Sequence, residues 1–219
     1  MPFNFEASED FNTSVAHINT LIQFAIQQRD AGMEENRLLF LKLAIVSSVT
    51  KFQVFIESIL KEYHYELKEN HKQYNQVSTH LRLNAIRLFT SDKIIHKSLE
   101  NPDTYTVDKL NEIRQVSEKT LAFCTDNERI SEDLQFDTKF PMGKTGVGEL
   151  SKLFRQVNGE DIFAHPPFDI NKLNEILGRR HAIIHEDSNP QITEETVEKY
   201  RDYLMTVIAY VDNYLEQHL

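Results

Sequence analysis

Residues 35–69 read ENRLLFLKLAIVSSVTKFQVFIESILKEYHYELKE. Apolar side chains recur in this stretch every three or four residues, which is the period of one face of an α-helix. We therefore predict one helix from about Glu35 to about Glu69, which is longer than the usual globular helix. The apolar positions that define it are Ile45, Val49, Phe52, Ile56, Ile59, Tyr63 and Leu67.

The same helical period extends over most of the chain, and no alternating strand pattern or internal repeat accompanies it. We predict an all-α fold, a single-domain helical bundle that spans residues 1–219. Asp169 and Thr193 are the expected N-caps of the last two helices. The other expected features are a helix through Phe11 and Ala25 that ends near Gly32, a helix through Val77 and Phe89, a helix start at Ser91–Asp92, a turn at 101–103, a helix through Val107, Leu110, Ile113, Val116 and Leu121, and a helix through Leu150 and Val157 that ends at Asn158–Gly159.

Residues 125–148 break this regularity. Proline and glycine gather there and the apolar period fades, which is typical of a loop. We predict a loop-rich insertion at 125–148, followed by a C-terminal part at 149–219 that carries the most notable motif.

Charge is unevenly distributed along the chain. The 219 residues include 34 acidic and 24 basic side chains, for a net charge of −10, which argues against a general nucleic-acid coat or a membrane-surface binder. Residues 71–99 nevertheless carry five basic side chains against one acidic, whereas 186–219 carry eight acidic against two basic. A phosphate backbone would therefore contact 71–99, with Arg82 and Arg87 as candidate substrate-binding residues. The alternative is an ordinary solvated face.

The cysteine count and the N-terminus bear on location. Cys124 is the single cysteine, so no intramolecular disulfide and no multi-cysteine metal site can form, which fits a reducing compartment. Beside Phe123, Cys124 is more typical of core filling than of a nucleophile. No leader pattern opens the chain, and three charged residues interrupt its most apolar window, 38–60. We expect a soluble cytoplasmic protein with no membrane partner.

The tripeptide at 143–145, Gly-Lys-Thr, resembles the end of a phosphate-binding P-loop. That loop needs a glycine at the position where Thr138 stands, and a buried strand before it. Neither requirement is met, so we reject this interpretation.

Residues 178–187 read GRRHAIIHED and form the densest group of chemically capable side chains. Arg180 continues the apolar stripe of Leu173 and Leu177, where an unpaired guanidinium is costly. A carboxylate, a partner subunit or an anionic ligand must therefore compensate it. His181 and His185 are one turn apart and share a face, while Arg180 and His185 are about 140° apart on an ideal helix.

Three interpretations of this group follow from its chemistry. The first is structural, with the arginine and histidines anchoring the helix. The second is a phosphodiester-cleaving site, with arginine holding the phosphate and histidine moving protons. The third is a metal site of His181 and His185, with Glu186 or Asp187 as a third ligand. Chemistry alone ranks them in this order.

The segment from Arg180 to His185 fits the arginine, polar residue, three residues, histidine pattern of the HEPN superfamily. It most resembles the small prokaryotic HEPN proteins of the RiboL-PSP kind. The setting agrees, because the motif lies late in a helical chain and a long helix follows it. The resemblance is firm from about Gly148 to the C-terminus.

This resemblance implies a metal-independent endoribonuclease that needs no cofactor and works as a homodimer, with two motifs meeting at a two-fold axis. By match, Arg180 binds and polarises the scissile phosphate, and His185 helps the ribose 2′-hydroxyl attack it. His181 takes the polar position, and Arg179 is an alternative arginine that binds substrate. Such proteins often act as toxins or phage-defence effectors with a cognate antitoxin or nucleotidyltransferase. The alternative is a non-catalytic HEPN binding or dimerisation partner.

Overall fold

A computed structural model describes residues 5–70, 72–93 (for 91–93 the backbone alone), 106–130, 134, 137–140, 146–185 and 191–219. Within these ranges the regular structure is helical, and the remaining backbone pairing is an isolated bridge between Gln73 and Arg129. The all-α prediction is therefore confirmed. The helices are α1 (Glu6–Asp30), α2 (Glu34–Glu69), the short 3-10 helix η1 (Tyr74–Gln76), α3 (Thr79–Lys93), α5 (Val107–Cys124), α6 (Gly146–Asn158), α7 (Ile170–His185) and α8 (Glu194–Glu216).

The chain packs as two compact units. The first comprises Met1–Tyr63, Thr138–Ser151 and Ile162–Leu219, and the second comprises His64–Asp137 and Lys152–Asp161. The prediction of one domain over 1–219 stays a prediction, because compactness alone does not show whether each unit folds independently.

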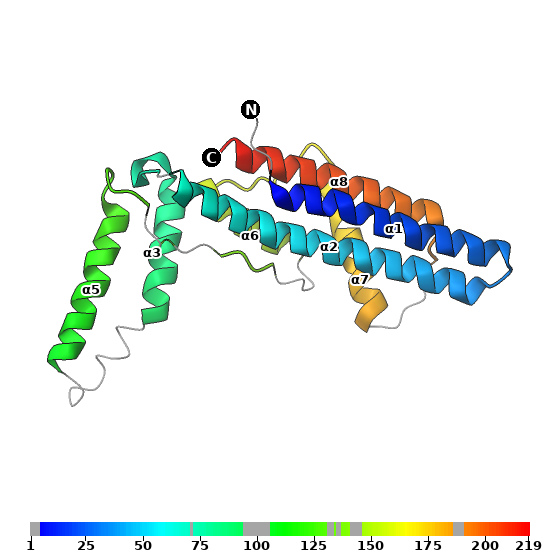
Figure 1. Cartoon of the computed structure of the whole chain (residues 1–219), viewed down its shortest axis with the longest axis horizontal. Coiled ribbons are helices and arrows are strands. Elements are labelled where there is room, and N and C mark those ends of the chain that lie inside the picture. Colours follow the sequence, from blue (N-terminus) through cyan, green and yellow to red (C-terminus); the bar gives the residue numbers. More distant parts are fainter. Residues whose placement is uncertain are drawn as a thin grey trace. The chain divides into compact units, whose positions relative to one another are not determined.

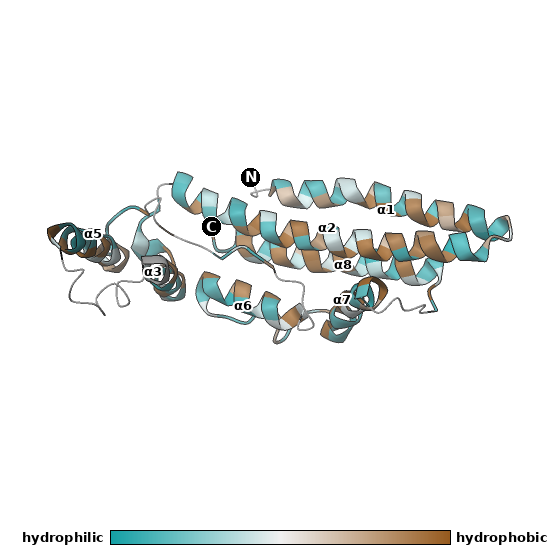
Figure 2. Ribbon diagram, turned by 90° about the horizontal axis from the view of Figure 1, so that it is seen from below, coloured by the Kyte–Doolittle hydropathy of each residue, from teal (hydrophilic) through white to brown (hydrophobic). Residues whose placement is uncertain are grey.

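Three long helices form the first unit's main layer. Figures 1 and 2 show α1, α2 and α8 side by side, and α7 runs across one face of them. Phe11 of α1 meets Phe55 of α2 edge-on, with ring centroids 6.3 Å apart. The interior of this layer is apolar, so burial of these faces is the main force that stabilises the unit. The buried residues of α8 recur every three or four positions along one side of the helix, and they are Val197, Tyr200, Leu204, Val207, Ile208, Val211, Tyr214 and Leu215.

By length and composition, α2 is apolar enough to cross a membrane. In the folded chain its buried side faces the core, with Leu41, Ile45 and Phe52 almost inaccessible to solvent. A helix of this kind is equally typical of the centre of a bundle. The observed bounds, Glu34–Glu69, agree with the prediction of about 35–69.

The helix ends follow local chemistry. Gly32 and Gly159 have φ of +72° and +90°, a conformation that glycine adopts without strain, and they end α1 and α6 as predicted. Thr193 accepts a hydrogen bond from the Thr196 N–H at 3.2 Å, so it caps α8 as predicted. The predicted helix start at Ser91–Asp92 is wrong, because the α3 ladder continues through Lys93. The helix after the loop-rich segment begins at Gly146, and the turn expected at 101–103 lies outside the described residues.

In the second unit α3 packs against α5. Phe123 is fully buried, and its ring meets those of Tyr74 and Phe89 edge-on, with centroids 5.8 and 5.6 Å away. The expectation that Cys124 fills the core is wrong: Cys124 is exposed, because successive helical residues point in directions about 100° apart and the buried side chain here is that of Phe123. The predicted apolar face of α5 also differs from the observed one, as described below.

One ion-pair cluster joins three helices of the first unit. Both oxygens of Glu194, at the start of α8, accept hydrogen bonds from Arg37 of α2, at 3.0 and 2.6 Å, and Arg29 at the end of α1 lies 3.4 Å away. The side chains of Glu194 and Arg37 are only 12% and 13% exposed, so solvent screens this bidentate pair weakly. The hydrogen bonds from Arg37 lower the pKa of Glu194 to about 2.

We expect Glu194→Gln to lower the free energy of unfolding at neutral pH by roughly 1–3 kcal/mol. A carboxyl whose pKa is depressed in the folded state stabilises above its unfolded pKa and loses that contribution as pH falls through the folded pKa. The wild type should therefore lose stability between about pH 4.5 and pH 2, and the variant should lose less. Urea unfolding across this range measures both. Glu195→Gln is the control, since Glu195 pairs with Lys199 at an exposed site, and an equal effect there would contradict the prediction.

Candidate active site

α7 is held at its start by α8 and by its own cap. The Asn171 N–H donates to the Asp169 carboxylate at 3.0 Å, as the predicted cap requires. The hydroxyl of Tyr203, on α8, donates to the Asp169 carbonyl at 2.6 Å. Further along, a Cβ at Gly146 would come within 2.6 Å of the end of the Leu177 side chain, so the start of α6 lies close against α7 and a larger residue there would require that side chain to shift. These contacts fix the position from which the motif projects.

Arg180 lies on the inner side of α7, as its place on the apolar stripe predicts. Leu173, Ile176 and Leu177 are buried on the preceding turns. The Nε of Arg180 is buried, and within the described residues it has no hydrogen-bond partner. An unsatisfied buried donor costs about 1–3 kcal/mol. This fork is therefore equipped to receive an acceptor that the described residues do not supply.

The two histidines of the motif lie against each other at the end of α7. The rings of His181 and His185 are 4.7 Å apart between centroids and tilted by 44°. His181 is half-buried, whereas His185 is exposed and is the last residue of the helix. One imidazole is thus open to a substrate, and its neighbour is close enough to orient it or exchange a proton through a water molecule.

Arg179 points to a different set of contacts. Its guanidinium acts on the hydroxyl of Tyr200 on α8 by lowering the pKa of that hydroxyl, and the same hydroxyl donates to Glu175. Burial raises the pKa of Tyr200, the bond to Glu175 raises it further and Arg179 opposes both. Lys172 lies 5.1 Å from the centre of the Tyr200 ring. Arg179 therefore ties α7 to α8, and its role in binding substrate stays a prediction.

Sequence reasoning missed Tyr200 and Glu175 as neighbours of the motif. Glu175 and Arg179 are four residues apart, a spacing that places them together on a helix. The proximity of these two residues could therefore have been predicted from the sequence. The approach of Tyr200 depends on how α8 packs, and no local pattern predicts it.

The two candidate arginines of residues 71–99 belong to the second unit. Arg82 donates to the Phe123 carbonyl at 2.8 Å and pairs with Asp126 at 2.7 Å, with its side chain 16% exposed. It therefore joins α3 to the end of α5. Arg87 is exposed and contacts Asn84 at 2.9 Å, so it is the more accessible of the two to a phosphate.

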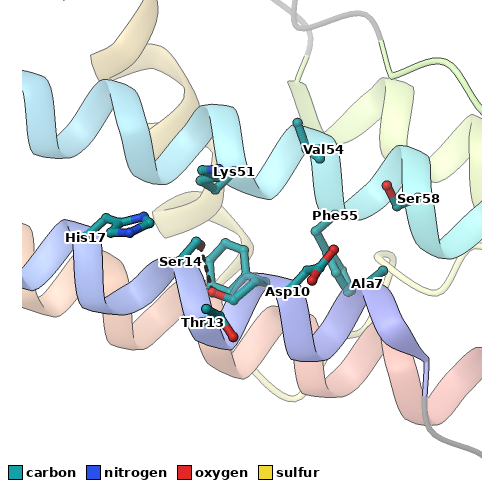
Figure 3. Close-up of a pocket in the computed structure, with 10 residues that line it drawn as sticks. Ala7, Asp10, Thr13, Ser14, His17, Lys51, Val54, Phe55 and Ser58 are labelled. Carbon is teal, nitrogen blue, oxygen red and sulfur yellow. Dashed lines mark hydrogen bonds between the residues drawn. The ribbon is translucent and has the colours of Figure 1, made fainter.

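The described residues contain no group of three or more histidine, cysteine or acidic side chains that could hold a metal ion. Glu186 and Asp187, the third ligands of the metal interpretation, lie outside those residues, as does the tripeptide at 143–145. A pocket of about 300 Å³ lies between α1 and α2 (Figure 3), and none of the motif residues lines it. Its polar side chains include Asp10, His17 and Lys51.

An all-α chain with an arginine on the inner side of a late helix and two histidines at that helix's end defines a helical protein of the HEPN type. The family model described as RiboL-PSP-HEPN matches residues 9–217, so the chain belongs to that family. The match extends far beyond the part from about Gly148 where the resemblance was firm. No curated protein and no solved structure matches the chain.

Proposed function

We propose that this protein is a metal-independent endoribonuclease that acts in the cytoplasm as a toxin or phage-defence effector. The observation that carries the proposal is the buried Nε of Arg180, which has no partner among the described residues, on the same helix as the paired imidazoles of His181 and His185. A guanidinium with free donors suits a phosphate, because its planar fork bonds two phosphate oxygens at once. Membership of a family whose members are often ribonucleases supports the same chemistry.

The proposed reaction is a transesterification within the RNA. His185 takes the proton of a ribose 2′-hydroxyl, whose oxygen then forms a bond to the adjacent phosphorus. Arg180 stabilises the added negative charge on the phosphoryl oxygens. The bond from phosphorus to the 5′-oxygen breaks, and that oxygen takes up a proton. The products are a 2′,3′-cyclic phosphate and a 5′-hydroxyl end, and His181 orients the catalytic imidazole.

The test is to incubate purified protein with mixed RNA in EDTA and to compare the wild type with His185→Ala. We expect cleavage by the wild type to survive chelation, because the arginine and the histidines supply charge stabilisation and proton transfer themselves. Activity that disappears on chelation and returns with added zinc would favour the metal interpretation instead. Wild-type protein that is folded but cuts no RNA would favour the alternative function, a binding or dimerisation partner for an antitoxin or a nucleotidyltransferase.

We also expect a two-fold homodimer with the end of α7 near the axis. Arg180 offers an unmet donor there, and Ile184 beside it is 45% exposed although apolar. An obligate interface of this kind buries more than about 2,000 Å² in total. Light scattering at micromolar concentration should therefore give twice the mass of the 25.6 kDa chain. A strictly monomeric species would contradict both the dimer and a site composed from two copies.

The acidic chain should bind RNA through a few local basic side chains, so its affinity should fall with salt with the shallow slope that a small number of phosphate contacts gives. The acidic side chains of the protein repel the phosphates of the RNA, most strongly at low ionic strength. This repulsion limits the number of phosphates that the protein contacts. Arg87, exposed on α3, is the residue outside the motif whose loss should weaken RNA binding while leaving the fold intact.

A further inference from the structure

α5 carries an apolar face that the described residues of its own compact unit leave uncovered. Its buried residues are Val116 and Phe123. Val107, Leu110 and Leu121, which the helical period marks as the apolar face, are 74%, 58% and 67% exposed. The apolar period of the sequence therefore marks one side of α5, whereas the packing of α5 against α3 buries a different side.

The exposed face has the spacing of a coiled-coil seam. Its residues follow one another at alternating intervals of three and four, which is the a/d spacing of two helices that pack along their length, with the polar residues Arg114 and Ser117 at the two central positions. All of them are exposed. In chain order the seam is Val107, Leu110, Arg114, Ser117, Leu121 and Cys124.

We propose that this seam pairs with the same seam of a second copy of the chain, antiparallel and about a two-fold axis. When the two-fold axis passes beside Gln115, the first residue of one seam lies opposite the last residue of the other seam. The second residue then lies opposite the fifth, and the third opposite the fourth. Leu110 then packs on Leu121 of the partner subunit, and Val107 lies opposite Cys124 of the partner subunit. The seam is therefore complementary to itself, as a two-fold interface requires.

Charge selects the antiparallel orientation. Arg114 and Glu118 are exposed, and neither forms an ion pair within the described residues. In the antiparallel pair, Arg114 lies opposite Ser117 of the partner subunit and beside Glu118 of the partner subunit, so opposite charges meet twice. A parallel pair would instead place the two copies of Arg114 together inside the seam, which is repulsive. Antiparallel helices also align their dipoles favourably.

The contact is small. α5 has 18 residues, about 27 Å of helix, so one pair of helices buries less than the standard interface and should bind weakly. It involves none of the residues of the proposed ribonuclease site and does not rest on that proposal. A cross-link that captures a weak contact is therefore a better test than mass alone.

The test uses Cys124 as one half of a disulfide. In the variant Val107→Cys, the new thiol should lie opposite Cys124 of the partner subunit, within the Cα separation of about 4.4–6.8 Å that a disulfide needs. Under mild oxidation we expect most of the variant to run as a covalent dimer on a non-reducing denaturing gel, with no free thiol, because the two-fold closes two disulfides. The wild type should not cross-link, since the antiparallel arrangement holds its two Cys124 residues at opposite ends of the seam.

Matched variants give the controls. Gln115→Cys places an exposed thiol on α5 off the seam, and Val107→Cys with Cys124→Ser lacks the second half of the bond, so neither should form the closed dimer. Adding Leu110→Glu to Val107→Cys should abolish the cross-link while circular dichroism stays unchanged, because Leu110 is exposed in the single chain. Cross-linking of the wild type would show a different pairing and would overturn the proposal. So would a ladder of higher species, or equal cross-linking by Gln115→Cys.

Discussion

Replacing His185 with alanine should lower RNA cleavage by roughly 10²–10⁴-fold, which is the usual contribution of a positioned general acid or base. The imidazole is the exposed member of the histidine pair at the end of α7, so it is the one that a ribose hydroxyl can reach. Because the side chain is exposed and terminal, its loss should change the free energy of unfolding by less than about 0.5 kcal/mol. Cleavage and stability should therefore separate cleanly in this variant.

The control for this prediction is His17→Ala. His17 is an exposed helical histidine of the same compact unit, on α1 and away from the motif, so its loss should leave cleavage unchanged. Cleavage is measured as initial rate on one defined RNA, with helicity and mass checked for each variant. Equal rates for His185→Ala and the wild type would show that the ribonuclease site is elsewhere. Equal losses for both histidine variants would point to a general defect.

Much of the fold is predictable from the sequence because it depends on local rules. The helical period gives α2 to within a residue or two, glycines mark the ends of α1 and α6, and Thr193 marks the start of α8. The failures arise where packing decides between local alternatives. Ser91–Asp92 has the composition of a helix start yet continues α3, and the apolar period of α5 marks the side that its own unit leaves exposed.

The same division holds for the candidate site. Helix geometry alone places Arg180 on the inner side of α7 and joins His181 to His185, and the structure agrees on both placements. Helix geometry does not reveal that Arg179 interacts with Tyr200, since Tyr200 belongs to the next helix, 21 residues later in the chain. Arg82 likewise has the composition of a phosphate binder, yet it bonds to a carbonyl and a carboxylate of its own unit. Tertiary partners decide which of several similar cations stays available.

Replacing Arg180 should lower activity without lowering stability, which is the opposite of what the loss of a structural arginine does. Its buried Nε lacks a partner within the described residues, so Arg180→Met, which keeps the length of the side chain and removes the charge, should leave the free energy of unfolding unchanged or raise it. The same variant should lower cleavage by about 10²–10³-fold, the effect of removing a group that stabilises developing charge. Arg180→Lys should restore little of this, because an ammonium group cannot grip two phosphate oxygens in one plane.

Arg179→Ala provides the matched comparison for Arg180→Met. It removes a guanidinium that interacts with the Tyr200 hydroxyl of α8, so it should lower the free energy of unfolding by about 1 kcal/mol and reduce cleavage much less than Arg180→Met does. Urea unfolding and initial cleavage rates on the same preparations measure both quantities. If Arg180→Met unfolds the protein while Arg179→Ala leaves stability unchanged, then Arg180 is the structural arginine. The phosphate-binding role would then pass to Arg179, the second arginine of the motif.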